Sequence, residues 1–302
     1  MSPTCVNNGV EATIGAWRKA IDAELGRVAI DGADLPERLR SAIHYSLTGE
    51  GKRLRGLLLL ASYDALGGRE DASGLAAAIE VVHAYSLVHD DLPCMDNDNM
   101  RRGRATTHRA YDVATATIAG VTMVPLAVLE TIRSARALGL DGKVTARLVG
   151  TLMRASGAAG MVGGQLLDLE AEGQRLSVQS LEAIHRAKTG ALIAAAFTMG
   201  GLAAGGSDDA IAALTSAGAA LGLAFQIADD VLDATESSEA LGKTAGHDAA
   251  LSKSTYASVL GVVPARQRSD ALVADAMARL DPGGLRTPAL DHLAHFVAAR
   301  RS

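Results

Sequence analysis

The chain has 302 residues, a formal net charge of −5 and only 3% aromatic residues. This length can form one large domain or two small ones, each with a sizeable core. The negative charge argues against a general nucleic-acid-binding protein, which needs a basic face to release counterions from the phosphate backbone. Cys5 and Cys94 lie far apart without metal-type spacing, so they fit a reducing compartment better than a disulfide framework.

Alanine and leucine dominate the composition, and no segment alternates β-branched and aromatic residues as strands do. We therefore expect an all-α protein. The first residues lack a basic start followed by an apolar stretch, so we predict no signal peptide and a cytoplasmic location.

Apolar residues recur at helical spacing in the first part of the chain, over residues 10–28 and again from Pro36 to Leu47. A basic segment, Gly51-Lys52-Arg53-Leu54-Arg55, then leads into an apolar helix expected over residues 57–66. Glycines and cations at the start of a helix can bind an anion. Taken alone, a basic first turn without a ligand is the simpler interpretation of this segment.

The helix expected over residues 72–88 runs into a dense group of acids and then bases. Residues 83–104 read HAYSLVHDDLPCMDNDNMRRGR. Neighbouring carboxylates repel one another unless cations or water screen them, and oxygen ligands of this kind suit Mg²⁺. Arginines match the oxygens of a phosphate. The segment predicts a diphosphate site, whereas a solvated charged loop is the alternative for residues 96–104 alone.

Pro93 is expected to break the helix, because its ring disfavours a straight continuation. On an ideal helix, positions six apart point about 240° away from each other. Asp90 and Asp96 can therefore share a metal ion only if Pro93 interrupts the regular path.

Further helices are expected over residues 111–138, 143–157 and 181–199, and the last one carries Lys188-Thr189-Gly190. The apolar span 190–206 is shorter than the about 20 residues that cross a bilayer. Its alanines and glycines suit close helix packing, so we predict no membrane span. Nothing resembles a linker or a repeat, and we expect a single domain over residues 1–302 that ends in two packing helices, 271–280 and 290–301.

A second acidic group occupies residues 225–233, which read FQIADDVLD. Asp229 and Asp233 are four residues apart and project from one face of a helix, with Gln226 on the same side. Acids on an apolar helix cost stability unless a cation meets them. Lys243 and Lys253 follow in a loop and can cover an anion.

The motifs resemble, in their order, those of the trans-isoprenyl diphosphate synthases, and they look most like the bacterial farnesyl or geranyl diphosphate synthases. The likeness runs from about residue 45 to 260. It rests on six motifs: Gly-Lys-Arg-x-Arg, Asp-Asp-x4-Asp with Arg-Arg-Gly-Arg, Lys-Thr-Gly, Phe-Gln-x-x-Asp-Asp-x-x-Asp, Gly-Lys, and Lys-Ser-Thr-Tyr.

The resemblance implies a single large helical bundle around a deep central cavity, in a homodimer, with the two aspartate groups facing each other. It implies that three Mg²⁺ ions link these aspartates to an allylic diphosphate, such as dimethylallyl or geranyl diphosphate, and assist its ionisation before isopentenyl diphosphate attacks. The implied metal-binding residues are Asp90, Asp96 and Asp229, with Asp91, Asp230 and Asp233 in support.

The same resemblance implies the remaining site residues. Thr189 and Gln226 place oxygen dipoles near the developing cation. Arg101, Lys188 and Lys253 bind the allylic diphosphate, whereas Lys52, Arg55, His83 and Arg102 bind that of isopentenyl diphosphate. Substrate-binding roles also fall to Gly51 and Lys243, and the catalytic residues are Lys188, Thr189, Gln226 and Lys253. His89 is interpreted as structural, and His83 without the resemblance reads as a core histidine.

Product length depends on how far the growing chain descends along the helix that ends at Asp90, at about 1.5 Å per residue. Tyr85, five residues before Asp90, is expected to block the cavity, whereas Ser86 leaves its position open. In similar enzymes a large residue at the Tyr85 site accompanies a C15 product, so we predict farnesyl diphosphate. Geranyl (C10) and geranylgeranyl (C20) diphosphate are the alternatives.

The sequence departs from the family pattern at four positions. Gly56 replaces the usual proline, and Glu50 the usual glycine. Val121 stands where an aspartate is common, and Pro125 lies in the same segment. Relatives have this helix near the dimer interface and the cavity floor, so the departures bear on assembly and product length.

Two other functions share some of these features. A terpene cyclase has the first aspartate group, but it normally carries an Asn/Ser/Glu triad instead of the second and has no use for a second diphosphate site. A non-catalytic partner subunit generally loses acids from one group, and both groups are intact here.

Overall fold

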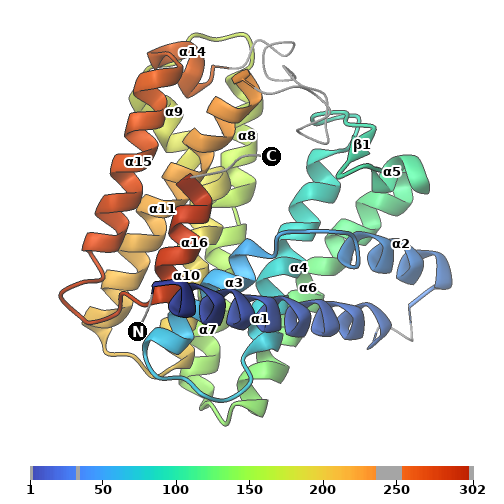
Figure 1. Cartoon of the computed structure of the whole chain (residues 1–302). Helices are drawn as coiled ribbons and strands as arrows, with labels where there is room; N and C mark the ends of the chain where they lie inside the picture. The colour runs from blue at the N-terminus through green and yellow to red at the C-terminus, as the bar shows by residue number, and fades with distance from the viewer. Residues whose placement is uncertain (1–2, 32–34, 236–253, 299–302) are drawn as a thin grey trace.

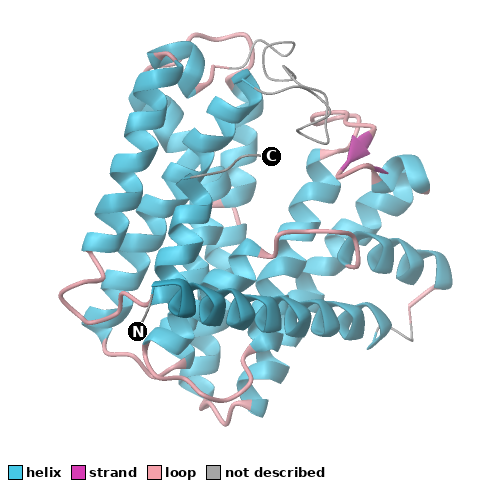
Figure 2. Ribbon diagram, in the orientation of Figure 1, coloured by secondary structure: helices cyan, strands magenta, loops and turns pink. Residues whose placement is uncertain are grey.

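The computed structural model describes residues 3–31, 35–235 and 254–298, and these residues are almost entirely helical, as Figure 1 and Figure 2 show. This confirms the expected all-α class. The first half of the chain contains α1 (Pro3–Asp31), α2 (Glu37–Leu47), α3 (Leu54–Ala65), α4 (Ser73–Asp90), the strands β1 (Met100–Arg101) and β2 (Arg104–Ala105), α5 (Thr107–Ala110) and α6 (Val113–Ala137).

The second half begins with α7 (Gly142–Ser156) and α8 (Met161–Glu170) and continues through a helix interrupted by a π turn. The remaining elements are α9 (Val178–His185), the π turn η1 (Arg186–Gly190), α10 (Ala191–Ala203), α11 (Asp208–Thr235), α14 (Tyr256–Leu260), α15 (Val262–Ala278) and α16 (Pro288–Ala298).

The core of the bundle lies where α10 packs between α3 and α11, while α4 packs along α6 and α11 along α15. Leu57, Leu58 and Leu59 of α3 are almost completely buried. A Cβ atom on Gly200 would lie 2.4 Å from the carbonyl oxygen of Leu59, so a glycine is required for α10 to approach α3 this closely. Each buried leucine contributes about 1.5–3 kcal/mol to folding. The apolar span of α10 is thus a short core helix, as its alanines and glycines indicated.

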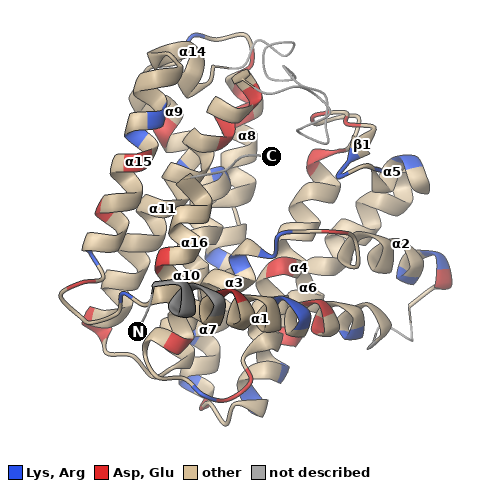
Figure 3. Cartoon of the chain, viewed as in Figure 1, with Lys and Arg blue, Asp and Glu red and all other residues tan. Residues whose placement is uncertain are grey.

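The C-terminal ends of α4 and α11 lie at the same end of the molecule (Figure 1), and acidic residues mark both ends in Figure 3. The helices that carry the two aspartate groups therefore bring them to one end of the bundle, where the β1–β2 hairpin also lies.

Two elements differ from the expected pattern. The helix expected over residues 181–199 contains the π turn η1, and the segment after the first acids forms a small antiparallel hairpin in which Met100 pairs with Ala105. The hairpin turn has positive φ at Arg102 (52°) and Gly103 (72°), the backbone twist that joins two strands through a two-residue loop. Strands of two residues leave no readable alternation in the sequence.

Within the described residues, α6 and α11 are long and apolar enough to span a membrane by length and composition alone. In α11, 61% of the most apolar window is buried inside the molecule. A buried core helix passes the same test, and this is the place of α11 in the bundle. In α6 the corresponding share is 33%, so much of its apolar surface faces outward.

Gly56 lies in the first turn of α3, where α3 meets α4. Its N–H donates a hydrogen bond to the buried carboxylate of Glu80 (2.9 Å), which satisfies one of the backbone donors that a helix start leaves without a partner. A Cβ atom at position 56 would lie 2.9 Å from Cδ1 of Ile21 and 3.0 Å from the carbonyl oxygen of Ala76. The usual proline has no N–H, so glycine at this position allows the hydrogen bond to Glu80. It also allows α3 to pack closely against Ile21 and Ala76.

We predict that Gly56→Ala lowers the free energy of unfolding. Alanine improves intrinsic helix propensity by about 1 kcal/mol, but overpacking against a neighbouring backbone oxygen costs about 1–3 kcal/mol. Gly15→Ala is the matched control, since a Cβ atom there meets nothing within 4 Å in the middle of α1. Urea unfolding should show a stabilised Gly15→Ala and a destabilised Gly56→Ala. Stabilisation by both substitutions would contradict the close packing at Gly56.

Candidate active site

The first aspartate group is built on the end of α4. The helix ends at Asp90, and the N–H of Asp96 donates to the carbonyl oxygen of Asp90 (2.9 Å), so the chain turns back as the position of Pro93 predicts. Burial raises the pKa of Asp90 to about 6; the charge of Lys188 opposes this rise, and that of Asp96 adds to it. Asp90 therefore faces Asp96 on its own loop and Lys188 from η1.

Asp91 points in another direction, toward the hairpin. Its buried carboxylate accepts a hydrogen bond from Nε of Arg101 (2.7 Å) and lies 2.6 Å from Nη2 of the same guanidinium. Nη2 of Arg101 also lies 3.4 Å from Asp98. Asp91 thus holds Arg101 in position through one carboxylate oxygen.

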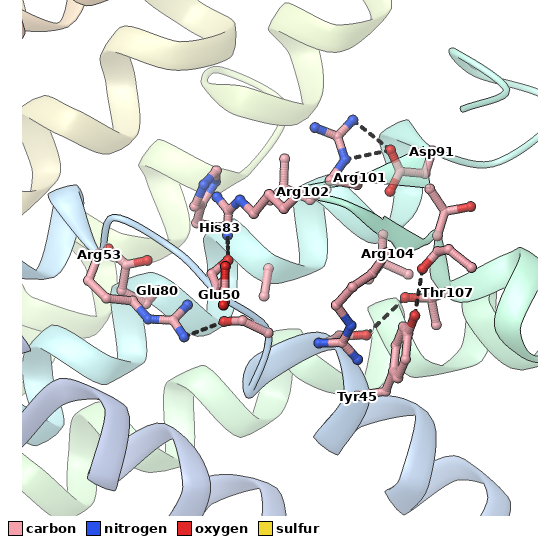
Figure 4. Close-up of a pocket in the computed structure, with 17 residues that line it drawn as sticks. Tyr45, Glu50, Arg53, Glu80, His83, Asp91, Arg101, Arg102, Arg104 and Thr107 are labelled. Carbon is pink, nitrogen blue, oxygen red and sulfur yellow. Dashed lines mark hydrogen bonds and ion pairs between the residues drawn. The ribbon is translucent and has the colours of Figure 1, made fainter. Parts of the chain in front are cut away.

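A pocket that is partly open to solvent lies between α2, α4 and the hairpin (Figure 4). Nη1 of Arg102 donates to the carbonyl oxygen of Glu50 (2.8 Å) at its rim. A Cβ atom at Gly51 would lie 2.7 Å from Nη1 of Arg102 and 2.8 Å from Nη1 of Arg53, so glycine lets both guanidinium groups approach. The charged residues that line the pocket are the bases Arg53, His83, Arg101, Arg102 and Arg104 and the acids Glu50, Glu80 and Asp91.

His83 lines this pocket from α4. Burial of the imidazole, together with the charges of Arg55, Arg102, Arg101 and Arg53, holds its pKa well below the ordinary value of 6.5. Its Nδ1 is buried and has no hydrogen-bond partner among the described residues. A neutral imidazole surrounded by arginines leaves a strongly positive environment, which suits an anion.

The basic residues before α3 lie in different places. Lys52 is exposed and lies over the ring of Phe296 of α16, 5.4 Å from its centroid, and Arg55 is 8% exposed in the first turn of α3. Arg53, which the sequence did not single out, lines the pocket instead and is fixed by Asp22 (2.7 Å) and by the carbonyl oxygen of Gly49 (2.6 Å). Arg55 still acts on His83 through its charge.

The second aspartate group lies on the last turns of α11, and Asp230 is its most buried member, 4% exposed, ahead of Asp233 at 8%. Oδ1 accepts from Nε2 of Gln226 (3.1 Å), and Oδ2 accepts from the backbone N–H of Tyr256 (2.8 Å) and lies 3.3 Å from Nε2 of His185. Three partners occupy both oxygens. Asp230 is thus held by groups from α9, α11 and α14, which is compatible with the supporting role that the resemblance implies.

Gln226 connects Asp230 to the π turn η1 through a second hydrogen bond. The hydroxyl of Thr189 donates to Oε1 of Gln226 (2.8 Å), and the neighbouring Nζ of Lys188 donates to Asp168 of α8 (2.6 Å). Because Asp230 can only accept, Nε2 of Gln226 must face it, and Oε1 must face Thr189. The lone pairs of the Thr189 oxygen are therefore oriented by a chain of hydrogen bonds that begins at Asp230. π turns frequently occur at functional sites.

The described residues contain no group of three or more His, Cys, Asp or Glu side chains that could hold a metal ion by themselves. The donor set still fits Mg²⁺, which is commonly bound by one or two carboxylates together with waters and substrate phosphates. Asp90 and Asp96 supply such carboxylates at the end of α4, and Asp229 and Asp233 at the end of α11. Burial is the main cause of the raised pKa of Asp90, with smaller contributions from the charges of Asp96 and Asp91, and a bound cation would favour its ionised form.

Other predicted residues lie near these groups or outside the described chain. Tyr85 and Ser86 are half-buried on α4, one turn before Asp90, and the hydroxyl of Ser86 donates to its own helix at the carbonyl oxygen of His83 (2.9 Å). Lys243 and Lys253 lie outside the described residues.

The structure adds residues that the sequence analysis did not assign to the site. Both side-chain polar atoms of Gln165 in α8 are buried and have no hydrogen-bond partner among the described residues, although Gln165 is only 8% exposed. Asp168, one turn further on, binds Lys188. In the sequence, the three-residue spacing of Gln165 and Asp168 places them on one helical face, and this spacing could have identified them as site residues. His185 and Arg53 gave no comparable signal, since only the fold brings them to the site.

Within the described part of the chain, the non-glycine residues with positive φ are Arg53 (50°), Asn97 (53°) and Arg102 (52°). All three lie in the two loops that form the basic pocket and the first aspartate group. Left-handed backbone is unfavourable for such residues and concentrates at functional sites.

Comparison with known proteins agrees with this geometry. The polyprenyl synthetase family model matches residues 36–280. The chain is 36% identical to farnesyl diphosphate synthase of Bacillus subtilis over 98% of this chain and 99% of that protein, and 39% identical to geranylgeranyl pyrophosphate synthase 7 of Arabidopsis thaliana over 88% and 78%. A geranyltransferase structure from Helicobacter pylori, complexed with magnesium and isoprenyl diphosphate, superimposes with a TM-score of 0.82 at 28% identity, covering 99% of this chain and 97% of that one.

The chain belongs to the polyprenyl synthetase family, and it is a prenyltransferase that elongates prenyl diphosphate chains.

We predict that His83 makes the protein less stable in mild acid. Because burial and the surrounding arginines lower the folded-state pKa, the unfolded chain takes up a proton below about pH 6.5 while the folded chain does not. The free energy of unfolding should therefore fall by about 1.4 kcal/mol per pH unit from this residue until its folded pKa is reached. The free energy of unfolding of the wild type and of His83→Gln should be measured from pH 7.5 to 5. It should fall more steeply with decreasing pH in the wild type than in the variant. Parallel curves would refute the prediction.

Proposed function

We propose that the protein condenses isopentenyl diphosphate head to tail with dimethylallyl or geranyl diphosphate and releases farnesyl diphosphate. The observation that carries this proposal is the pairing of two aspartate groups at one end of the bundle with Lys188 facing Asp90. A basic pocket next to the first group offers arginine side chains to a second diphosphate. The similarity to farnesyl diphosphate synthases along nearly the whole chain supports it further.

Three Mg²⁺ ions are proposed at the site, with Asp90 and Asp96 on one side and Asp229, aided by Asp233, on the other. The neighbouring structure with magnesium and isoprenyl diphosphate supports the metal and the ligand class. Mg²⁺ bound by these aspartates would supply Lewis-acid assistance to cleavage of the C–O bond of the allylic diphosphate. Lys188 and Arg101 then bind the released negative charge, and their acids, Asp168 and Asp91, keep them in position.

Thr189 and Gln226 stabilise the allylic cation with fixed oxygen dipoles. The hydroxyl proton of Thr189 is committed to Gln226, so its oxygen presents lone pairs without any rearrangement during the reaction. The double bond of isopentenyl diphosphate attacks the cation, and the departing diphosphate is the proposed base for the final proton. No protein nucleophile is needed.

Tyr85 is proposed to set the C15 limit. It lies five residues before Asp90, about 7.5 Å along α4, and it is half-buried, whereas Ser86 is small and bonded to its own helix. Geranylgeranyl diphosphate is the second candidate, because relatives of that name match most of the chain. A terpene cyclase or a non-catalytic subunit has less support, since the second group is intact on α11 and curated relatives are named as synthases.

The test is product analysis with isopentenyl diphosphate and each allylic starter, with and without Mg²⁺. We expect a Mg²⁺-dependent C15 product, and longer products from Tyr85→Ala because the block is removed. Ser86→Ala is the matched control on the next position and should keep the C15 product. A wild-type C20 product, or an unchanged length in Tyr85→Ala, would contradict Tyr85 as the limit, and no condensation at all would refute the synthase.

A cytoplasmic homodimer is proposed as the working form. α6 presents a row of outward apolar residues at helical spacing: Ile118, Val121, Pro125 and Leu129. Ile118, Val121 and Leu129 are 55%, 59% and 63% exposed, and such a row on one helix marks an interaction surface. Val121 in place of an acid makes this surface more apolar, and the missing N–H of Pro125 lies on its exposed side.

We predict that Val121→Glu weakens the dimer by placing a charge in an apolar interface. Analytical ultracentrifugation should show a dimer for the wild type and a larger monomer fraction for the variant. Val263→Glu is the control, because Val263 is 66% exposed on α15, away from α6. A monomeric wild type, or equal effects of both substitutions, would count against the α6 interface.

A further inference from the structure

We propose that His89 is a positioning residue that fixes the orientation of Tyr85 and thereby sharpens the product-length limit. The inference rests on the proposed role of Tyr85, and it gives a function to a histidine that binds no substrate and no metal. The proposal rests on a series of contacts: Tyr85 packs against His89, and His89 contacts Thr117 and Gly120 of α6.

The His89 ring is fixed on its outer side by α6. Nε2 lies 3.0 Å from the carbonyl oxygen of Thr117. A carbonyl oxygen only accepts, so Nε2 carries the proton and the tautomer of the ring is defined. α4 and α6 pack closely along their length, which makes this contact a link between two core helices rather than a surface bond.

Gly120 provides the space that the ring occupies. A Cβ atom at position 120 would lie 2.3 Å from Nε2 and 2.4 Å from Cδ2 of His89. Gly120 is fully helical and its φ needs no glycine, so the absence of a side chain is required only by the His89 ring. The ring therefore sits in a fitted recess, with one face set by Gly120 and one edge set by Thr117.

Tyr85 packs against this fixed ring. The two ring centroids are 4.9 Å apart and the ring planes are inclined by 71°, an edge-to-face contact of the favourable kind. Tyr85 is one turn before His89 on α4, so the contact selects one side-chain orientation on that helix face. A half-buried tyrosine has other orientations open to it once this contact is lost.

The physical consequence concerns selectivity more than rate. A growing prenyl chain meets a Tyr85 ring whose orientation is favoured by its contact with His89, which is itself held against α6. Without His89, the ring exchanges between orientations, and a fraction of the chains pass it before release. Loss of one aromatic contact corresponds to a rise of roughly twofold to tenfold in the ratio of C20 to C15 product.

The experiment compares product distributions of the full-length wild type, Tyr85→Ala, His89→Ala and the double variant, with thermal unfolding measured alongside. We expect His89→Ala to give mixed C15 and C20, and the double variant to match Tyr85→Ala, because His89 acts only through Tyr85. His89→Gln keeps a donor for Thr117 but not the ring, so it should restore stability more than selectivity. Gly120→Ala should broaden the products by displacing His89, and His292→Ala, a half-buried histidine of α16, should not.

The outcomes separate the two proposals. If Tyr85→Ala lengthens the product and His89→Ala does not, the positioning role is overturned and the Tyr85 limit stands. If the double variant gives longer products than Tyr85→Ala, His89 forms a wall of its own and the positioning role is again overturned. If Tyr85→Ala leaves product length unchanged, the Tyr85 limit and the role of His89 both fall. Should His89→Ala fail to fold, Gly120→Ala and His89→Gln decide the question.

Discussion

The buried carboxylate of Asp230 is the interaction on which the catalytic face of α11 depends. It joins α11 to α9 through His185 and to the start of α14 through the N–H of Tyr256, and it orients Gln226 within its own helix. A buried carboxylate is stable only when hydrogen bonds replace its lost hydration. Because these partners come from separate segments, Asp230 fixes how the helices meet at this end of α11.

The two sides of the site are built by different means. On the α11 side, the functional groups project from regular helix and a π turn, and a hydrogen-bond chain sets their directions. On the α4 side, they come from loops with left-handed residues, and ion pairs such as Asp91 with Arg101 hold them. Backbone strain at Arg53, Asn97 and Arg102 is tolerated because the surrounding contacts compensate for it. The α4 side is therefore the one whose geometry depends most on charge.

Regular features of the sequence predicted most of the fold and the outer part of the site. Helical periodicity gave the long helices, Pro93 gave the break after Asp90, and the spacing of Asp229 and Asp233 gave a common helix face. Periodicity could not reveal the π turn at Lys188, because one additional residue in a turn leaves no compositional mark. Lys52 lies over Phe296 while Arg53 lines the basic pocket, because the backbone at Arg53 is left-handed. This conformation is rare for arginine, so the sequence could not predict it. The partners of Asp230 are distant in sequence and meet only through tertiary packing.

The π turn also restricts which relatives can share this arrangement. A turn closed by bonds from residue i to i+5 contains one residue more than the helix around it requires. Deleting a single residue between His185 and Ala191 would restore a regular helix and leave α9 and α10 in nearly the same register, because the π turn accommodates its additional residue within one turn. The turn that presents Lys188 to Asp168 and Thr189 to Gln226 would be lost, while the flanking helices could still pack. A deletion in this short stretch should consequently affect the site more than the fold.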